Sequence, residues 1–440
     1  MDKQNTDNKV ELTHKSQIIL IIMCWAVYTI AYIGRYTYTS NVGPITKFYG
    51  VDKDEFGLAT TFFFFAYGAG QILNGIFCRR YNMRYMISGA LVVSGLINGA
   101  VFFGLPFVYI KYVWLINGLC QSVFWASLVR ILSCYLDGKH IKTAMLVMST
   151  CVTIGTLLIY GISALFALFD GFKYTFLLAF VTLTGMFVIW LLYYPFITKN
   201  ARLENIPARA NNEDVSATSS DEITNKEKTG NRAVIFSGIF MIIALFAIYA
   251  VVSSFAKDGL TTWVPLILND KYDMPDSLSI ILTLVLPIFG LCGATLAIFL
   301  NKYIKNNSDM QGVFFTLSAV TVLGIVFLFK TDLWYLVLIL LGLVSLFMNG
   351  VNNVITNIFP LSVGKKHNAG LIAGVLNGAC YVGSALSQYI IPLIEKSGGW
   401  DTVMNVFLYA FVAISVFSFL LFLIRQIKNR KVQGNFEKRV

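Results

Sequence analysis

The 440-residue chain is 57% hydrophobic and only 13% charged, and its formal net charge is +11. Soluble domains carry about 25% charged residues, so this composition excludes an ordinary water-soluble protein. The seven cysteines form no CxxC pair and only three histidines are present, so no disulfide framework, metal centre or cofactor site is indicated.

The chain contains twelve apolar segments that are each long enough to cross a bilayer. Backbone exposed to lipid must satisfy its own hydrogen bonds, so continuous apolar runs indicate helices and not barrel strands. The sequence therefore predicts an all-α membrane protein with twelve transmembrane helices. We expect them at residues 16–44, 54–78, 83–104, 108–135, 140–169, 172–197, 233–268, 276–301, 310–330, 332–359, 367–394 and 401–426.

One long polar insertion, residues 198–232, interrupts this pattern and has the composition of a flexible linker. It divides the chain into an N-terminal six-helix bundle, 16–197, and a C-terminal six-helix bundle, 233–426. The tails 1–15 and 427–440 are polar. We expect two pseudo-symmetric bundles.

The basic residues indicate the orientation. Of 34 lysines and arginines, 24 lie on the side of both termini and the central linker, and seven lie in the opposite loops. This bias predicts cytoplasmic termini in an inner or plasma membrane. The basic residues are spread over many short loops, so nucleic acid is not an expected partner. The expected surroundings are a lipid bilayer, and we expect a monomer.

Arg35 is the only charged residue between Lys15 and Lys47. On a continuous helix it would lie roughly 30 Å from Lys15 and roughly 18 Å from Lys47. A charge inside an apolar span costs at least about 2.5 kcal/mol and usually marks a functional site.

The position recurs, because Lys257 follows Arg35 by 222 residues, and Asp276 follows Asp54 by the same interval. Two cations related by an internal repeat predict an anion held between two similar halves.

Polar side chains accompany each cation at helical spacing. Tyr28, Tyr32, Tyr38 and Thr39 lie at −7, −3, +3 and +4 from Arg35, and Ser253, Ser254 and Thr261 lie at −4, −3 and +4 from Lys257. These stripes predict donor-rich walls for an anion. The alternative is that the arginine pairs with a buried carboxylate.

Asp258 is the only acid well inside a span, and it lies about 100° around the helix from Lys257. It either neutralises Arg35 or Lys257 when no substrate is bound, or it carries a proton. We favour the ion pair. Gly259 beside it predicts a close helix contact.

Six spans, a polar loop and six further spans resemble the major facilitator superfamily. The loop Gly75 to Arg84 resembles its cytoplasmic signature, although Arg79 and Asn301 stand where that signature has acidic residues. An inter-half charge clamp built on those acids is therefore not expected.

Several further motifs resemble the organophosphate:inorganic phosphate antiporters, which include the glycerol-3-phosphate and hexose-6-phosphate carriers. They are Arg35 with its aromatic surroundings, FGLATTFFFFAYGAGQILNGIF (56–77), the segment from Gln121 to Arg130, KDGLTTWVP (257–265), AGVLNGACYVGSALSQ (373–388) and the tripeptide Gly399-Trp400-Asp401. This resemblance implies alternating-access exchange of a phosphorylated sugar or polyol for inorganic phosphate.

The chain departs from the best-known carriers of that family at three positions. Gln71 replaces a lysine, Val152 replaces a histidine, and Lys257 replaces an arginine. A lysine supplies a point charge and no bidentate fork. The two-cation site for an organic anion remains the expectation.

The candidate substrate-binding residues are Arg35, Lys257, Tyr32, Tyr38, Gln71, Gln121, Trp125, Asn353 and Tyr381, with Asp258 for coupling or charge balance. Asn349, Asn352, Asn357 and Gln388 are further polar positions. All of the amides have an alternative role in interhelical hydrogen bonds.

Three other functions stay open as alternatives. A proton-coupled symporter of a sugar acid or other carboxylate would use Asp258 as its titrating group. A transporter-like sensor of sugar phosphate would signal through its helices. An enzyme is the least supported, because no nucleophile–base pair or metal-ligand cluster appears.

Overall fold

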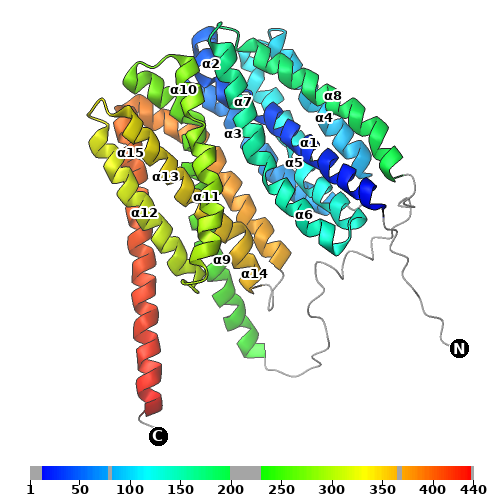
Figure 1. Cartoon of the computed structure of the whole chain (residues 1–440). Helices are drawn as coiled ribbons and strands as arrows, with labels where there is room; N and C mark the ends of the chain where they lie inside the picture. Colours follow the sequence, from blue (N-terminus) through cyan, green and yellow to red (C-terminus); the bar gives the residue numbers. More distant parts are fainter. Residues whose placement is uncertain (1–11, 78–81, 199–228, 364–368, 438–440) are drawn as a thin grey trace, which may run out of the picture. The chain divides into compact units, whose positions relative to one another are not determined.

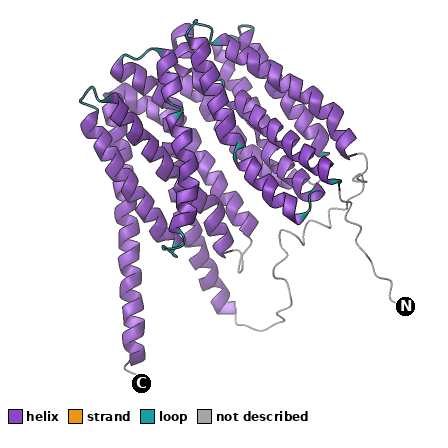
Figure 2. Ribbon diagram, in the orientation of Figure 1, coloured by secondary structure: helices purple, strands orange, loops and turns teal. Residues whose placement is uncertain are grey.

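The computed structural model describes residues 12–77, 82–198, 229–363 and 369–437, and these ranges are helical with no strand (Figure 2). Within them, eleven segments are long and apolar enough to cross a membrane. The last of these, residues 372–427, is 56 residues long and bends at Gly399, whose backbone is not helical (φ 70°). It is long enough for two crossings, so the expectation of an all-α protein with twelve spans is confirmed.

The elements follow one another along the chain as shown in Figure 1. They are α1 (His14–Tyr36), the 3₁₀ turn η1 (Thr39–Asn41), α2 (Val42–Tyr49), α3 (Lys53–Phe77), α4 (Met83–Phe102), α5 (Phe107–Tyr135), α6 (Gly138–Ser149), α7 (Cys151–Ala167), α8 (Lys173–Thr198), α9 (Thr229–Tyr272), α10 (Asp276–Leu282), α11 (Val285–Leu300), α12 (Asn307–Leu328), α13 (Trp334–Asn353), the π-helix η2 (Val354–Ile358), α14 (Phe359–Val363) and α15 (Ala369–Glu437).

The unbroken helix expected over 16–44 is instead interrupted after Tyr36. Side chains that follow the break compete for its backbone: Ser40 and Asn41 both donate to the Thr37 carbonyl, at 3.3 and 2.7 Å. Such local bonds offer the chain an alternative to helix. The expected helices 140–169, 276–301 and 332–359 are likewise divided, as α6/α7, α10/α11 and α13/η2/α14.

The described residues form two compact units. Unit 1 takes them from Met1–Asn41 and Ala66–Asp221, and unit 2 from Val42–Phe65 and Glu222–Val440. The boundaries expected for the two six-helix halves stay a prediction, and nearly all of the expected linker lies outside the described residues. The grouping of 42–65 with the second unit was not expected.

Ion pairs attach residues 42–65 within unit 2. Lys47 pairs with Asp276 at 2.8 Å, and Lys53 lies 2.6 Å from Asp270 and 2.8 Å from Glu395. Lys396 donates to Asp52 at 2.7 Å, and this hydrogen bond lowers the pKa of the Asp52 carboxyl. These contacts join the end of α2 and the start of α3 to α9, α10 and α15.

In unit 1, α1 packs against α5, α7 and α8, and α4 packs against α8. Asn82 caps α4 by accepting a hydrogen bond from the Arg84 backbone at 3.0 Å. Arg84 in turn donates to the Leu191 carbonyl of α8 at 2.7 Å. Asn82 and Arg84 of the family-like loop therefore have structural roles, whereas Arg79 lies outside the described residues.

In unit 2, glycines let α9 and α15 approach closely. A Cβ on Gly383 would lie 2.1 Å from the Val251 carbonyl oxygen. A Cβ on Gly259 would lie 2.5 Å from Ile391 and 3.1 Å from Ser387. Small residues at helix crossings permit this spacing, so the close contact expected at Gly259 is confirmed.

Gly383→Ala should lower the thermal stability of the purified protein, because the new methyl group meets backbone, and such overpacking costs about 1–3 kcal/mol. Gly378→Ala is the matched control, because a Cβ there on the same helix has no neighbour within 4 Å. Equal melting temperatures for the two variants would contradict the packing described.

Candidate functional site

Arg35 lies in the last turn of α1 and is only 8% exposed. Its guanidinium carbon lies 4.6 Å from the ring centroid of Tyr67, 5.3 Å from that of Tyr32 and 5.5 Å from that of Tyr36. A cation over an aromatic face gains about 0.5–2 kcal/mol. Three tyrosines from α1 and α3 thus offset part of the desolvation cost of this charge.

The aromatic group continues around α1. Tyr28 lies 5.1 Å from Tyr32 and 5.2 Å from Trp125, while Tyr36 lies 6.4 Å from Tyr160, measured between ring centroids. The candidates Tyr32 and Trp125 therefore belong to one group with Arg35.

Three members of this group were missed as candidates: Tyr36, Tyr67 and Tyr160. Tyr67 had a signal, since it lies in the family-like Ala-Tyr-Gly motif of α3. Tyr160 lies on another helix, and no spacing along the sequence points to it.

Other candidates of unit 1 occupy different surroundings. Tyr38 follows the end of α1 and packs against Trp114, with 5.0 Å between ring centroids and no exposed surface. Gln121 is 3% exposed and donates to the Ser94 hydroxyl at 3.0 Å. Gln71 is half-buried one turn after Tyr67 on α3.

A buried amide network holds the backbone beside Arg35. The side chains of Asn98 and Asn117 donate to the Gly34 carbonyl at 3.3 and 3.5 Å, and Thr37 donates to Asn98 at 2.8 Å. Each of these three side-chain partners is fully buried. The interruption of α1 leaves late carbonyls without intrahelical donors, and α4 and α5 supply them. The network therefore fixes the chain that carries the guanidinium.

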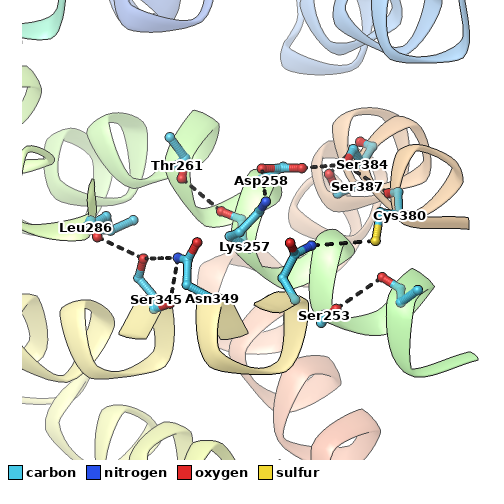
Figure 3. Close-up of polar contacts among 12 residues, drawn as sticks. Ser253, Lys257, Asp258, Thr261, Leu286, Ser345, Asn349, Cys380, Ser384 and Ser387 are labelled. Atoms are coloured by element: carbon cyan, nitrogen blue, oxygen red, sulfur yellow. Dashed lines mark hydrogen bonds and ion pairs between the residues drawn. The ribbon is translucent and has the colours of Figure 1, made fainter. Parts of the chain in front are cut away.

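The Lys257 ammonium of unit 2 lies 3.4 Å from Asp258 Oδ1, and the two side chains are 24% and 16% exposed. The second carboxylate oxygen, Oδ2, accepts a hydrogen bond from Ser384 of α15 (Figure 3). Gln388 donates to the Asp258 backbone carbonyl at 3.4 Å. The structure thus places Asp258 between Lys257 and α15.

The hydroxyls at helical spacing from Lys257 are largely occupied by α9 itself. Ser253 donates to the Ala250 carbonyl at 3.1 Å, and Thr261 donates to the Lys257 carbonyl at 2.9 Å. Such back-bonds are typical of serine and threonine inside helices. The expected donor wall is therefore smaller than the sequence pattern indicates.

Two asparagines of α13 have neighbours within unit 2. Asn349 donates to the Ser345 carbonyl at 2.8 Å, and Asn352 donates to the Cys380 sulfur at 3.5 Å. The contact of Asn352 brings Cys380, which was not a candidate, into the surroundings of Lys257.

The candidate Asn353 ends α13, where the π-helix η2 begins. Its buried Oδ1 has no hydrogen-bond partner among the described residues. Single π turns occur frequently at functional sites. The remaining candidate, Tyr381, is half-buried on α15, and Asn357 is exposed.

Asn98→Ala should destabilise the protein by about 1–3 kcal/mol, because it removes a donor from a buried carbonyl and the acceptor of Thr37. Asn74→Ala is the control, since Asn74 is half-buried and its Ser122 partner also bonds a backbone carbonyl. The measurement is thermal unfolding in detergent, and a larger loss in the Asn74 variant would contradict the network.

Comparison with known families and proteins relates the whole fold to transporters. The Major Facilitator Superfamily profile matches residues 24–388. A "Sugar phosphate exchanger 3" of Xenopus laevis is 22% identical over 402 residues, covering 82% of this chain and 78% of that protein. A "Probable hexose phosphate transport protein" of Chlamydia pneumoniae is 24% identical over 416 residues, covering 90% and 88%.

Solved structures support the same fold. A bacterial homologue of the human lysosomal transporter Spinster, in an inward-facing and unoccupied conformation, superposes with a TM-score of 0.68 at 12% identity, covering 93% of this chain and 97% of that one. A D-xylose–proton symporter superposes with a TM-score of 0.67 at 11% identity, covering 91% and 97%. At this identity the similarity concerns the fold alone.

Proposed function

The chain belongs to the Major Facilitator Superfamily, and we propose that it exchanges a phosphorylated sugar or polyol for inorganic phosphate by alternating access. Membership makes it a multi-pass membrane transporter and not an enzyme. The observation that carries the proposal is one cation inside an apolar span of each unit, Arg35 and Lys257, at positions 222 residues apart. The names of the relatives, which include a sugar phosphate exchanger and a hexose phosphate transport protein, support this substrate class.

The two cations have different chemistry toward an anion. The guanidinium of Arg35 is planar and matches two phosphate oxygens, whereas the Lys257 ammonium is a compact point charge with three donors. Charge-assisted hydrogen bonds of this kind contribute about 1.5–3 kcal/mol each. The tyrosines around Arg35 add hydroxyl groups and ring faces that suit the polyhydroxylated part of a sugar phosphate.

The surroundings of the protein follow from the same proposal. The bias of 24 basic residues against seven supports cytoplasmic termini in an inner or plasma membrane. A single chain supplies both cations and all twelve spans, which supports a monomer within the lipid bilayer.

Asp258 favours a second candidate function, proton-coupled symport of a carboxylate. Its side chain is 16% exposed and lies inside a span. An intramembrane acid is a frequent proton carrier in transporters. The contact with Lys257 supports the first candidate instead, because the carboxylate then balances the charge of the ammonium.

Arg35→Ala and Lys257→Ala should each abolish uptake of labelled hexose phosphate into phosphate-loaded liposomes, because each removes a charge-assisted contact. Lys257→Arg should keep exchange, since it retains the cation. Lys330→Ala is the control, because this lysine is exposed. Folded alanine variants of Arg35 or Lys257 that exchange at the wild-type rate would refute the two-cation proposal.

Asp258→Asn separates exchange from proton symport. An exchanger should keep counterflow of labelled for unlabelled substrate and should not respond to an imposed pH gradient. Uptake into anion-free liposomes that follows a pH gradient in the wild type, and disappears in Asp258→Asn, would establish symport in place of exchange.

A further inference from the structure

The Lys257–Asp258 contact is long for a lysine–carboxylate pair. The shortest contacts of four other lysines in unit 2, Lys47, Lys53, Lys271 and Lys396, lie between 2.6 and 2.8 Å. Those lengths agree with ordinary charge-assisted hydrogen bonds, which are about 2.7–2.9 Å long. The Lys257 ammonium, at 3.4 Å from its carboxylate, is thus held more loosely than these lysines, although it lies in an apolar span where an ion pair has little competition from water.

Ser384 provides a physical reason. Its hydroxyl donates to Asp258 Oδ2 and also lies 3.0 Å from the Cys380 carbonyl. Ser384 is only 1% exposed, so water does not compete for this bond. The adjacent Gly383 places α15 against the α9 backbone at Val251, which leaves the serine little freedom to move away.

The backbone of Asp258 is fixed from the same side. Gln388, one helical turn after Ser384, is fully buried and donates to the Asp258 carbonyl at 3.4 Å. Ser384 and Gln388 therefore engage the side chain and the main chain of one residue from one face of α15. This arrangement favours the carboxylate position near α15 over a position closer to the ammonium.

We propose that Ser384 is a positioning residue that draws the Asp258 carboxylate away from Lys257 and thereby keeps the ammonium available to the transported anion. This inference rests on the proposed function and deepens it. The carboxylate still balances the lysine charge in the empty protein. A phosphate group that approaches Lys257 then has to displace only a loose partner, so Ser384 raises the affinity of the site for anions without touching the anion.

The test is calorimetric titration of purified full-length protein with inorganic phosphate. Ser384→Ala should weaken phosphate binding about tenfold, because the released carboxylate competes for Lys257 with the strength of a charged hydrogen bond. Ser387→Ala is the matched control on the same helix, since its hydroxyl donates to the Ser384 carbonyl and not to Asp258. Ser384→Thr retains a hydroxyl and should bind more tightly than the alanine variant.

A second variant distinguishes positioning from a general structural effect. Asp258→Asn removes the competing charge, so it should bind phosphate more tightly than the wild type. In the Asp258→Asn background, Ser384→Ala should have no further effect on phosphate affinity. A simple packing defect would weaken binding equally in both backgrounds.

The outcomes separate this inference from the proposed function. A wild-type protein that binds no phosphate would overturn both. A wild-type protein that binds phosphate, with equal affinities in Ser384→Ala and Ser387→Ala, would overturn the role of Ser384 alone. If Ser384→Ala does not fold, Asp258→Asn decides: unchanged or weaker phosphate binding in that variant would also overturn this role.

Discussion

The cost of placing a positive charge inside an apolar helix governs the whole arrangement. Each unit meets this cost in a different way. Unit 1 surrounds the Arg35 guanidinium with the faces of three tyrosine rings, which attract a cation without neutralising it. Unit 2 places a carboxylate beside Lys257 and then holds that carboxylate with Ser384. Both solutions stabilise the cation while leaving it able to bind an anion.

The supporting helices are built to hold these two residues. The break after Tyr36 leaves the Gly34 carbonyl to the buried amides of Asn98 and Asn117, so Arg35 follows a fixed stretch of backbone. Lys257 lies on α9, and the glycines at 259 and 383 bring this helix against α15. The polar contacts to Asp258 depend on this close approach, because a serine or glutamine side chain spans only a short distance.

Much of the fold could be predicted from sequence, because the length and hydropathy of a membrane-spanning helix are set by the bilayer. The two cations could also be found, since a charge is conspicuous within an apolar run and the interval of 222 residues links them. The breaks in α1 and η2 could not be placed, because they depend on local hydrogen bonds that compete with the helix. Spacing along one helix identified Tyr32, but it gave no access to Tyr67, which reaches Arg35 from α3. The same limit applies to Ser384 on α15. Tyr38 shows the opposite error, since the helical offset that placed it beside Arg35 no longer applies once α1 has ended.

The central claim is that Arg35 and Lys257 act on the same anion. A double-mutant cycle on inorganic phosphate affinity, with Arg35→Gln and Lys257→Gln singly and combined, tests it most directly. The account predicts that each single variant loses most of the phosphate affinity and that the double variant loses less than the sum of the two free-energy changes, because the first substitution already removes part of the shared interaction. Phosphate affinity that persists at the wild-type level in the folded double variant would contradict the account.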